Sequence, residues 1–166
     1  MVKLVDTTEW REFRVGDLFD ITKGSRLTKK DQVSGDIRFV GSSAVNNGVT
    51  GHVGNDKCVF EEDALTVAYN GSVGESFYQD EPFWASDDVN VLRRKDAQLF
   101  GVGRALFMAT LMRYLGKRFD FTFKWNLKTM SDTIVRLPSK KTYLPDWRTL
   151  AEYLSLSLWM ERVVSI

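Results

Sequence analysis

The sequence is poor in the side chains that build metal sites and disulfide frameworks. Its 166 residues include one cysteine, Cys58, and one histidine, His52. A single cysteine cannot form an internal disulfide and is typical of a reducing compartment. The two residues together cannot supply the ligands of most zinc sites. We expect His52 on an exposed loop or strand, and no bound metal.

Long apolar runs and targeting segments are also missing. No run approaches the ~20 apolar residues that a membrane-spanning helix requires. Residues 1–10 lack the hydrophobic core of a signal peptide. We therefore expect a cytoplasmic protein with no membrane partner.

Signatures of catalysis are missing as well. Neither the Asp-x-Lys or Glu-x-Lys signature of metal-dependent nucleases nor the Asn/Asp-Pro-Pro-aromatic loop of amino-methyltransferases occurs. Gly101 and Gly103 fall inside an expected helix, so they do not form a nucleotide-binding loop after a strand. Asp87-Asp88 is more typical of turn capping than of metal binding, and residues 61–63 (EED) are typical of a solvated surface. We therefore expect a binding protein that is not an enzyme and needs no cofactor.

Apolar residues and unevenly distributed charge are what the chain does have. Hydrophobic residues make up 43% of it, with 11 Phe, 5 Trp and 5 Tyr, which is enough for the core of one domain. Residues 1–92 carry 9 Lys/Arg and 16 Asp/Glu, whereas residues 93–141 carry 12 Lys/Arg and 3 Asp/Glu. A second basic cluster consists of Lys23, Arg26, Lys29 and Lys30.

Concentrated basic residues are typical of phosphate binding, because neutralising phosphates releases condensed counterions. A solvated helix face is the simpler explanation of a charge run taken alone. Residues 117–128, KRFDFTFKWNLK, however, interleave basic with aromatic side chains. This interleaving favours a nucleic-acid partner.

Apolar periodicity and turn residues predict an α+β domain with a small twisted sheet, mixed or antiparallel, and packed helices. Two β-rich runs at residues 65–69 and 75–78 flank NGSVG, whose Asn and Gly tolerate the positive φ of a tight hairpin. Further strands are expected at residues 12–15, 19–22, 37–40, 49–53, 58–60 and 133–137. Helices are expected at residues 29–33, 97–115 with Asp96 as N-cap, and 127–131.

A carboxyl-terminal helix is predicted after Pro145, with Asp146 as its N-cap. Apolar residues recur in it at steps of three and four: Trp147, Leu150, Ala151, Leu154, Leu158 and Trp159. Such a stripe packs either on its own domain or on a partner chain, and both interpretations stay open.

Seven ordered segments resemble the target-recognition domain of the DNA specificity subunits of type I restriction–modification systems. They are WREFRVGDLFDITKG (10–24), FVGS with NNGV (39–42, 46–49), TVAYNGSVG (66–74), FWASDDVNVL (83–92), FKWNL (123–127), Ile134-x-x-Leu137-Pro138 and PDW (145–147). Together they span about residues 9–160.

The resemblance implies a DNA target-recognition domain over residues 1–138, a linker over 139–145 and the start of a spacer or dimerisation helix over 146–166. It implies sequence-specific binding of double-stranded DNA on behalf of modification (methyltransferase) and restriction subunits. A complete specificity subunit has two such domains, so this chain is expected to be a half-subunit or a fragment that pairs with a second recognition domain. Pairing of two copies would favour a palindromic, interrupted target.

Candidate DNA contacts follow from residue type and expected position. Phosphate contacts are expected from the basic side chains Lys23, Arg26, Lys29, Lys30, Arg118, Lys124 and Lys128. Base edges are expected to be read by Asn46, Asn47, Tyr69, Asn70 and Ser72, with Arg118 or Lys124 as candidate guanine readers. Trp125 and Phe123 are candidates for stacking, although large aromatic residues beside a strand more often belong to the core.

Two alternatives remain. One is the recognition domain of a single-chain type II restriction–methyltransferase, which would share fold and chemistry. The other is a carbohydrate-binding module in which Trp84, Trp125 and Tyr78 stack on sugars. Salt separates DNA from sugar, because phosphate binding weakens steeply with salt.

Overall fold

The computed structural model describes residues 7–96, 98–120, 122–139, 144–150 and 152. Ten strands form three sheets among these residues. The strands are β1 (Trp10–Arg14), β2 (Phe19–Lys23), β3 (Ile37–Val40), β4 (Val49–Val53), β5 (Val59–Phe60), β6 (Ala64–Ala68), β7 (Ser76–Gln79), β8 (Phe83–Ala85), β9 (Val89–Arg94) and β10 (Ile134–Pro138). The helices are α1 (Val15–Leu18), α2 (Val102–Gly116) and α3 (Leu127–Asp132), with 3-10 turns η1 (Lys29–Asp31) and η2 (Asn46–Gly48).

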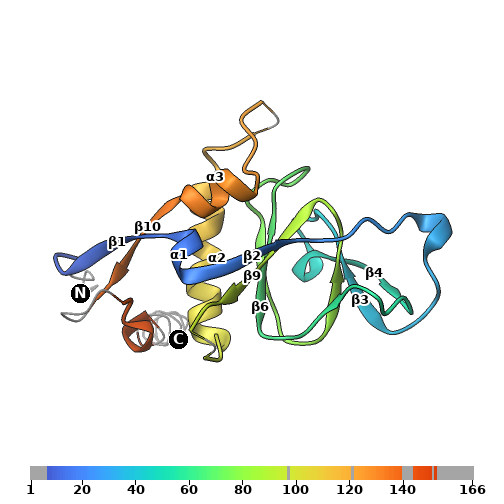
Figure 1. Ribbon diagram of the computed structural model, residues 1–166, viewed down its shortest axis with the longest axis horizontal. Helices are drawn as coiled ribbons and strands as arrows, with labels where there is room; N and C mark the ends of the chain where they lie inside the picture. Colours follow the sequence, from blue (N-terminus) through green and yellow to red (C-terminus); the bar gives the residue numbers. More distant parts are fainter. Residues whose placement is uncertain (1–6, 97, 121, 140–143, 151, 153–166) are drawn as a thin grey trace, which may run out of the picture.

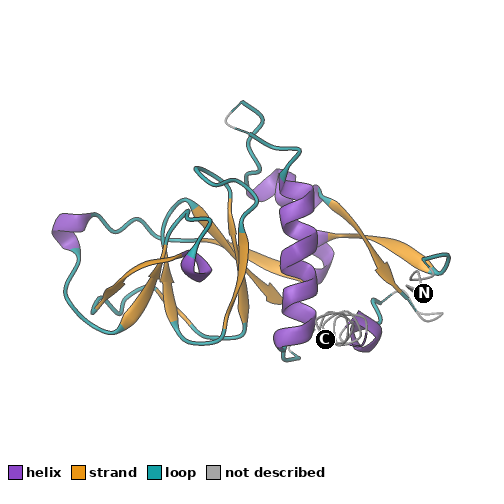
Figure 2. Cartoon of the chain, turned by 180° about the vertical axis from the view of Figure 1, so that it is seen from behind, coloured by secondary structure: helices purple, strands orange, loops and turns teal. Residues whose placement is uncertain are grey.

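The central sheet has the order β2-β9-β6-β7, and all its pairings are antiparallel. Its strand β6, with sequence ALTVA, is buried along its whole length because both faces of the sheet are covered. The helix α2 lies against β6 and β7 (Figure 2). It contributes Ala105, Met108 and Met112 to the main core.

A second sheet has the order β4-β3-β8-β5, in which β3 and β8 run parallel. A smaller core of Val40, Phe83, Ala85 and Val91 lies between it and the central sheet. Parallel and antiparallel pairs thus coexist in one small domain with few helices. The predicted α+β class with a mixed or antiparallel sheet is confirmed.

A two-stranded ribbon of β1 and β10 lies at the opposite end of the molecule from β3 and β4 (Figure 1). Trp10 stands opposite Pro138 and Arg14 opposite Ile134, so the ribbon joins segments that are distant in sequence. The helix α3 leads into β10. Its N-cap is Asn126, whose side chain accepts a 3.1 Å hydrogen bond from the amide of Thr129.

The long helix begins later than the sequence predicts. It starts at Val102, not Ala97, because Gly101 adopts a positive φ of 67° and breaks the helical path. Asp96 forms an ion pair with Arg94 instead of capping this helix. The carboxylate of Asp63 lies at the helix start instead, where it accepts hydrogen bonds from the amides of Phe100 (2.6 Å) and Gly101 (3.0 Å).

Asp63 was expected on a solvated surface, and this prediction is wrong. Its carboxylate also accepts a 2.8 Å hydrogen bond from the hydroxyl of Tyr78 on β7. One side chain therefore joins the start of α2 to the edge of the central sheet.

The hydroxyl of Tyr78 makes the stability of the fold sensitive to alkaline pH. Burial and the hydrogen bond to Asp63 raise the pKa of Tyr78 to about 12 from 10.0. Because the folded-state pKa is raised, the stabilisation is complete below pH 10.0 and is lost as pH rises towards about 12. We expect Tyr78→Phe to be less stable at neutral pH and to lose less stability in this window. Denaturant unfolding at both pH values measures the difference, and an equal alkaline loss in both proteins would contradict it.

One predicted helix is shorter than expected, and two strands were not predicted at all. The predicted helix at residues 29–33 is only the 3-10 turn η1. Strands β8 and β9 were not predicted, although β9 lies in the middle of the central sheet. Within the described residues, no helix is long and apolar enough to cross a membrane. Nor does that part of the chain group three or more His, Cys, Asp or Glu residues suitably for a metal ion.

The first turn of the carboxyl-terminal helix packs on the domain itself. Asp146 caps it as predicted, accepting hydrogen bonds from the amide (3.3 Å) and hydroxyl (2.6 Å) of Thr149. The indole of Trp147 packs against Phe19 and Phe100 with ring centroids 6.0 Å away from each, and Leu150 is fully buried. The rest of the predicted stripe, Ala151, Leu154, Leu158 and Trp159, lies outside the described residues.

Candidate nucleic-acid interface

The hairpin between β6 and β7 carries the candidate base readers. Its register pairs Leu65 with Tyr78 and Val67 with Ser76, so residues 69–75 form the connecting loop. The hydroxyl of Tyr69 donates to the backbone oxygen of Asp87, at 2.5 Å. The amide nitrogen of Asn70 donates to the carboxylate of Asp88 at 2.9 Å. Both side chains are therefore oriented by the turn between β8 and β9.

A third loop, residues 41–48, closes over the same hairpin. The hydroxyl of Ser42 donates to the backbone oxygen of Asn70 and accepts a 2.9 Å hydrogen bond from the amide of Ser72. The hairpin loop is thus held from two sides by segments that are distant in sequence. We call residues 41–48, 69–74 and 86–88 the loop cluster.

Two basic side chains border the loop cluster. The ammonium of Lys23 lies 5.6 Å from the ring centroid of Tyr69. The hydrogen bond with the Tyr69 side chain, supported by the charges of Asp87 and Asp88, raises the pKa of Lys23. The guanidinium of Arg26 lies 3.7 Å from the carboxylate of Asp87, and its side chain is 77% exposed. Both side chains are exposed at the border of the loop cluster.

The back of the hairpin loop rests on the end of α2. Gly74 has a φ of 87°, and a Cβ built there would lie 2.7 Å from the Cα of Gly116. No side chain fits between the two backbones. This backbone contact fixes the position of the hairpin loop relative to the end of α2.

A second basic group lies between α2 and β10. Arg118, Lys124 and Lys128 are exposed in this segment, which rises at the top of Figure 1 beside the hairpin loop. The helix α3 packs over the sheet end that carries Lys23: the sulfur of Met130 lies 3.7 Å from the amide nitrogen of Asn90, whose strand partner is Lys23. The two basic groups thus belong to the same end of the central sheet.

Lys29 and Lys30 are not joined to these groups. They are exposed on η1, the short blue helix far to the right in Figure 1. The segment is held there by Asn55, which donates to the backbone oxygen of Asp31 at 3.0 Å. Their role as phosphate contacts stays a prediction.

Asn46 and Asn47 have mainly structural contacts. Both adopt positive φ, 52° and 54°. The amide nitrogen of Asn47 donates to the backbone oxygen of Tyr78 at 2.9 Å, and Gln79 returns a hydrogen bond to the backbone oxygen of Asn47 at 3.0 Å. The amide nitrogen of Asn46 donates to the backbone oxygen of Val49 at 3.0 Å. These bonds shape the loop, and direct base reading by either residue stays untested.

The structure corrects the prediction for Trp125. Its ring is fully buried, and its indole nitrogen donates to the hydroxyl of Thr133 at 2.9 Å, so it cannot reach DNA in this conformation. Trp84 is also buried, with its indole nitrogen on the backbone oxygen of Ser25. Two of the three rings proposed for sugar stacking are therefore unavailable, which removes the basis of that alternative.

Sequence reasoning missed three positions that organise the loop cluster: Ser42, Asp87 and Asp88. Asp87-Asp88 was interpreted as turn capping, and it does lie in a turn, but it also orients Tyr69 and Asn70. These residues could have been found from the sequence, because Ser42 lies in FVGS and Asp87 and Asp88 lie in FWASDD. Both segments belong to the same ordered pattern as TVAYNGSVG, which carries Tyr69 and Asn70.

The chain is similar to known proteins in sequence and in fold. The chain is 33% identical over 145 residues to the Type II restriction enzyme BgcI specificity subunit S.BcgI of Heyndrickxia coagulans, covering 87% of this chain and 42% of the relative. Its fold matches the S subunit of a type I restriction–modification system from M. genitalium with a TM-score of 0.65, at 18% identity, over 93% of this chain and 41% of that one. It also matches the HsdS subunit of Thermoanaerobacter tengcongensis with a TM-score of 0.66, at 16% identity, over 96% and 40%.

The chain thus spans less than half the length of the proteins that it matches. The two structural likenesses establish its fold. The family model described as Type I restriction modification DNA specificity domain matches residues 7–158, and the chain therefore belongs to this family.

Proposed function

We propose that this chain recognises a short sequence in double-stranded DNA and directs modification and restriction subunits to it. The observation that carries the proposal is the loop cluster, in which Tyr69 and Asn70 are oriented by hydrogen bonds beside the cations Lys23 and Arg26. Family membership supports it, because the family is described by DNA specificity.

The chemistry of the loop cluster suits base reading. Sequence is read by side chains that present donors and acceptors at fixed positions in the major groove. Asp88 fixes the direction in which the amide of Asn70 faces, and Ser42 fixes the backbone on either side of Gly71. Rigid support of this kind is what precise recognition requires. Lys23, Arg26, Arg118, Lys124 and Lys128 supply sequence-independent phosphate contacts.

In this role the chain binds DNA and leaves the chemistry to its partners. We propose that it works in the cytoplasm with methyltransferase and restriction subunits, and that a second recognition domain or a second copy reads the other half of the target. The matching relative is named the specificity subunit of a type II restriction enzyme. Either class of system could therefore use this domain.

Fluorescence anisotropy with a pool of random duplexes tests the proposal. We expect an enriched motif after selection and sequencing, and an affinity whose logarithm falls linearly with the logarithm of salt concentration. Removing two phosphate contacts in Lys23→Ala/Arg26→Ala should reduce the salt slope by about 2. It should weaken binding to all sequences alike, by about tenfold or more at moderate salt.

The matched control removes two exposed cations from elsewhere, in Arg136→Ala/Arg148→Ala. Arg136 lies on β10 and Arg148 on the carboxyl-terminal helix turn, away from the loop cluster (Figure 1). An equal change of salt slope in both double variants would show that net charge, and not this surface, determines binding. Absence of any retained duplex, with and without a methyltransferase subunit, would overturn the proposed function.

A further inference from the structure

Three aromatic rings form a column that runs from the core to the surface beside α3. Phe119 stacks on Trp125 with ring centroids 5.0 Å apart and planes 8° from parallel. Phe123 stacks on Phe119 at 5.8 Å and 15°. Trp125 is fully buried, whereas Phe123 is 64% exposed. The column is anchored at one end and open at the other.

Hydrogen bonds hold the exposed end of the column in place. The carboxylate of Asp120 accepts from the amides of Thr122 (2.8 Å) and Phe123 (2.7 Å). At the buried end, the indole nitrogen of Trp125 donates to Thr133. Phe123 is therefore a positioned ring, and one of its faces is already occupied by Phe119. It has one free face to offer.

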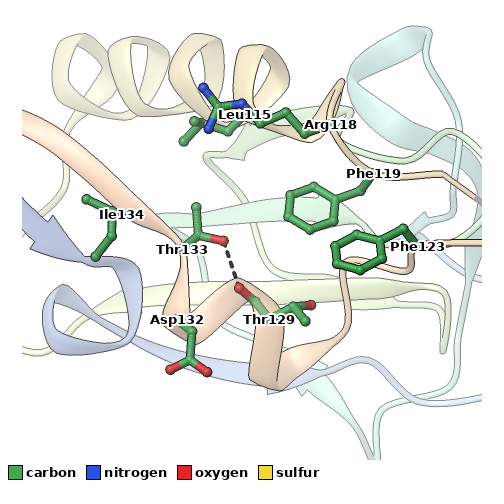
Figure 3. Close-up of a pocket in the computed structure, with 8 residues that line it drawn as sticks. All are labelled: Leu115, Arg118, Phe119, Phe123, Thr129, Asp132, Thr133 and Ile134. Atoms are coloured by element: carbon green, nitrogen blue, oxygen red, sulfur yellow. Dashed lines mark hydrogen bonds between the residues drawn. The ribbon is translucent and has the colours of Figure 1, made fainter.

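A hollow of about 390 Å³ lies next to the column (Figure 3). Phe119 and Phe123 line one side of it, and Arg118 lies at its rim. Thr129 and Asp132 of α3 line the other side with polar groups. Its volume is in the range of about 300–1,000 Å³ that small-molecule sites occupy, and its lining combines aromatic rings with a few polar groups.

The charge around the hollow favours a nucleic acid as its occupant. Residues 117–128 contain four basic side chains, Lys117, Arg118, Lys124 and Lys128, and one acidic residue, Asp120. Of the side chains that line the hollow, Arg118 and Asp132 are charged, and the carboxylate of Asp132 is paired with the guanidinium of Arg14. The carboxylate of Asp120 is turned onto backbone amides. A planar aromatic seat inside a basic segment has the features that bind unpaired bases, where stacking is combined with phosphate contacts.

We propose that a single nucleobase that has left the stack of the bound duplex lies against the free face of Phe123, at the open end of the column and beside the hollow. The proposal rests on the proposed function. A paired base inside a duplex has both faces covered by its neighbours, so a ring with one free face has nothing to stack on there. A base displaced by a kink, a bulge or extrusion of a nucleotide has such a face. Phe123 would then stabilise the distorted form of the target over the regular one.

The test compares intact duplexes of the selected motif with a series that carries one unpaired adenine analogue, placed at each position in turn. We expect the wild-type chain to bind the best-placed bulged duplex about tenfold more tightly than the intact one. Fluorescence of the analogue should fall on binding as it stacks. Phe123→Ala should lose this preference while it binds intact duplex within about threefold of wild type, and Phe123→Trp should keep it.

The control is Tyr114→Ala, because Tyr114 is exposed to a similar extent (62%) but lies on α2, outside the hollow. Phe123→Leu, with an apolar side chain and no ring, separates loss of stacking from loss of apolar area. If the wild-type chain binds intact duplex but shows no preference for any bulge, or if Phe123→Ala keeps the preference, this inference is overturned and the proposed function stands. If no duplex binds, the proposed function itself fails.

Discussion

Replacing Asp63 by alanine is expected to lower the free energy of unfolding by about 3 kcal/mol or more. The carboxylate accepts three hydrogen bonds, from the amides of Phe100 and Gly101 and from the hydroxyl of Tyr78. A hydrogen bond to a charged group contributes about 1.5–3 kcal/mol, and a carboxylate at a helix start gains further from the helix dipole. Without it, the amides of Phe100 and Gly101 just before α2 lose their acceptor, and Gly101 offers no side-chain cap to the helix. Denaturant unfolding measures the loss.

Two further variants make the Asp63 prediction specific. Asp63→Asn keeps a residue that tolerates the positive φ of 61° but removes the charge, so it should lose part of the stability that alanine loses. Glu62→Ala removes an exposed neighbouring charge and should change stability by less than about 0.5 kcal/mol. A value for Asp63→Ala as small as that of Glu62→Ala would show that the carboxylate does not hold α2.

Gly74→Ala is expected to impair both stability and DNA binding. Its φ of 87° is unfavourable for alanine, and the new Cβ would lie 2.7 Å from the Cα of Gly116, which is backbone and cannot rotate away. Backbone strain and overpacking each contribute about 1–3 kcal/mol, so a loss of about 2–5 kcal/mol is expected. The hairpin loop must move off α2 to relieve the contact, and this displaces Asn70 and Ser72. Thermal unfolding and anisotropy on the selected motif measure the two effects.

Gly51→Ala is the matched control. Gly51 has no left-handed φ, and no atom of the described chain lies within 4 Å of where its Cβ would stand. This substitution should leave stability and binding unchanged, or raise stability slightly by restricting the unfolded chain. Normal DNA affinity in a folded Gly74→Ala protein would mean that the position of the hairpin loop relative to α2 does not matter for recognition.

Local signals predicted the elements whose residues act within a few positions of one another. The β6–β7 hairpin, the helix α3 and the cap at Asp146 all follow from turn, cap and periodicity rules. Strand β9 was missed because VNVLRR places polar residues in a buried strand. Asn90 and Arg94 have partners there that are distant in sequence: Met130 lies over Asn90, and Trp147 stacks on Arg94 at 4.6 Å, in addition to the ion pair of Arg94 with Asp96.

In the candidate site, too, the sequence predicted which segments come together but not the contacts that each side chain makes with distant residues. The resemblance pointed to loops that do come together: Lys23 lies beside Tyr69, Arg26 beside Asp87, and Ser42 binds the amide of Ser72. Residue type alone could not predict which part of the chain each asparagine side chain binds. Asn70 is oriented at the hairpin tip, whereas Asn47 is bonded to Tyr78 and Gln79. Trp125 illustrates the same limit for aromatic residues, since its neighbours in sequence are exposed and it is not.

The pairing of β1 with β10 affects how this protein is synthesised. Trp10 leaves the ribosome more than a hundred residues before its strand partner Pro138. At about 5–20 residues per second, the nascent chain waits many seconds with Phe13 and Val15 unable to reach Val135. The hairpin that carries Asn70 can form well before this closure. A polypeptide interrupted before residue 134 would therefore hold the loop cluster on an open core, and we expect proteases to remove it quickly.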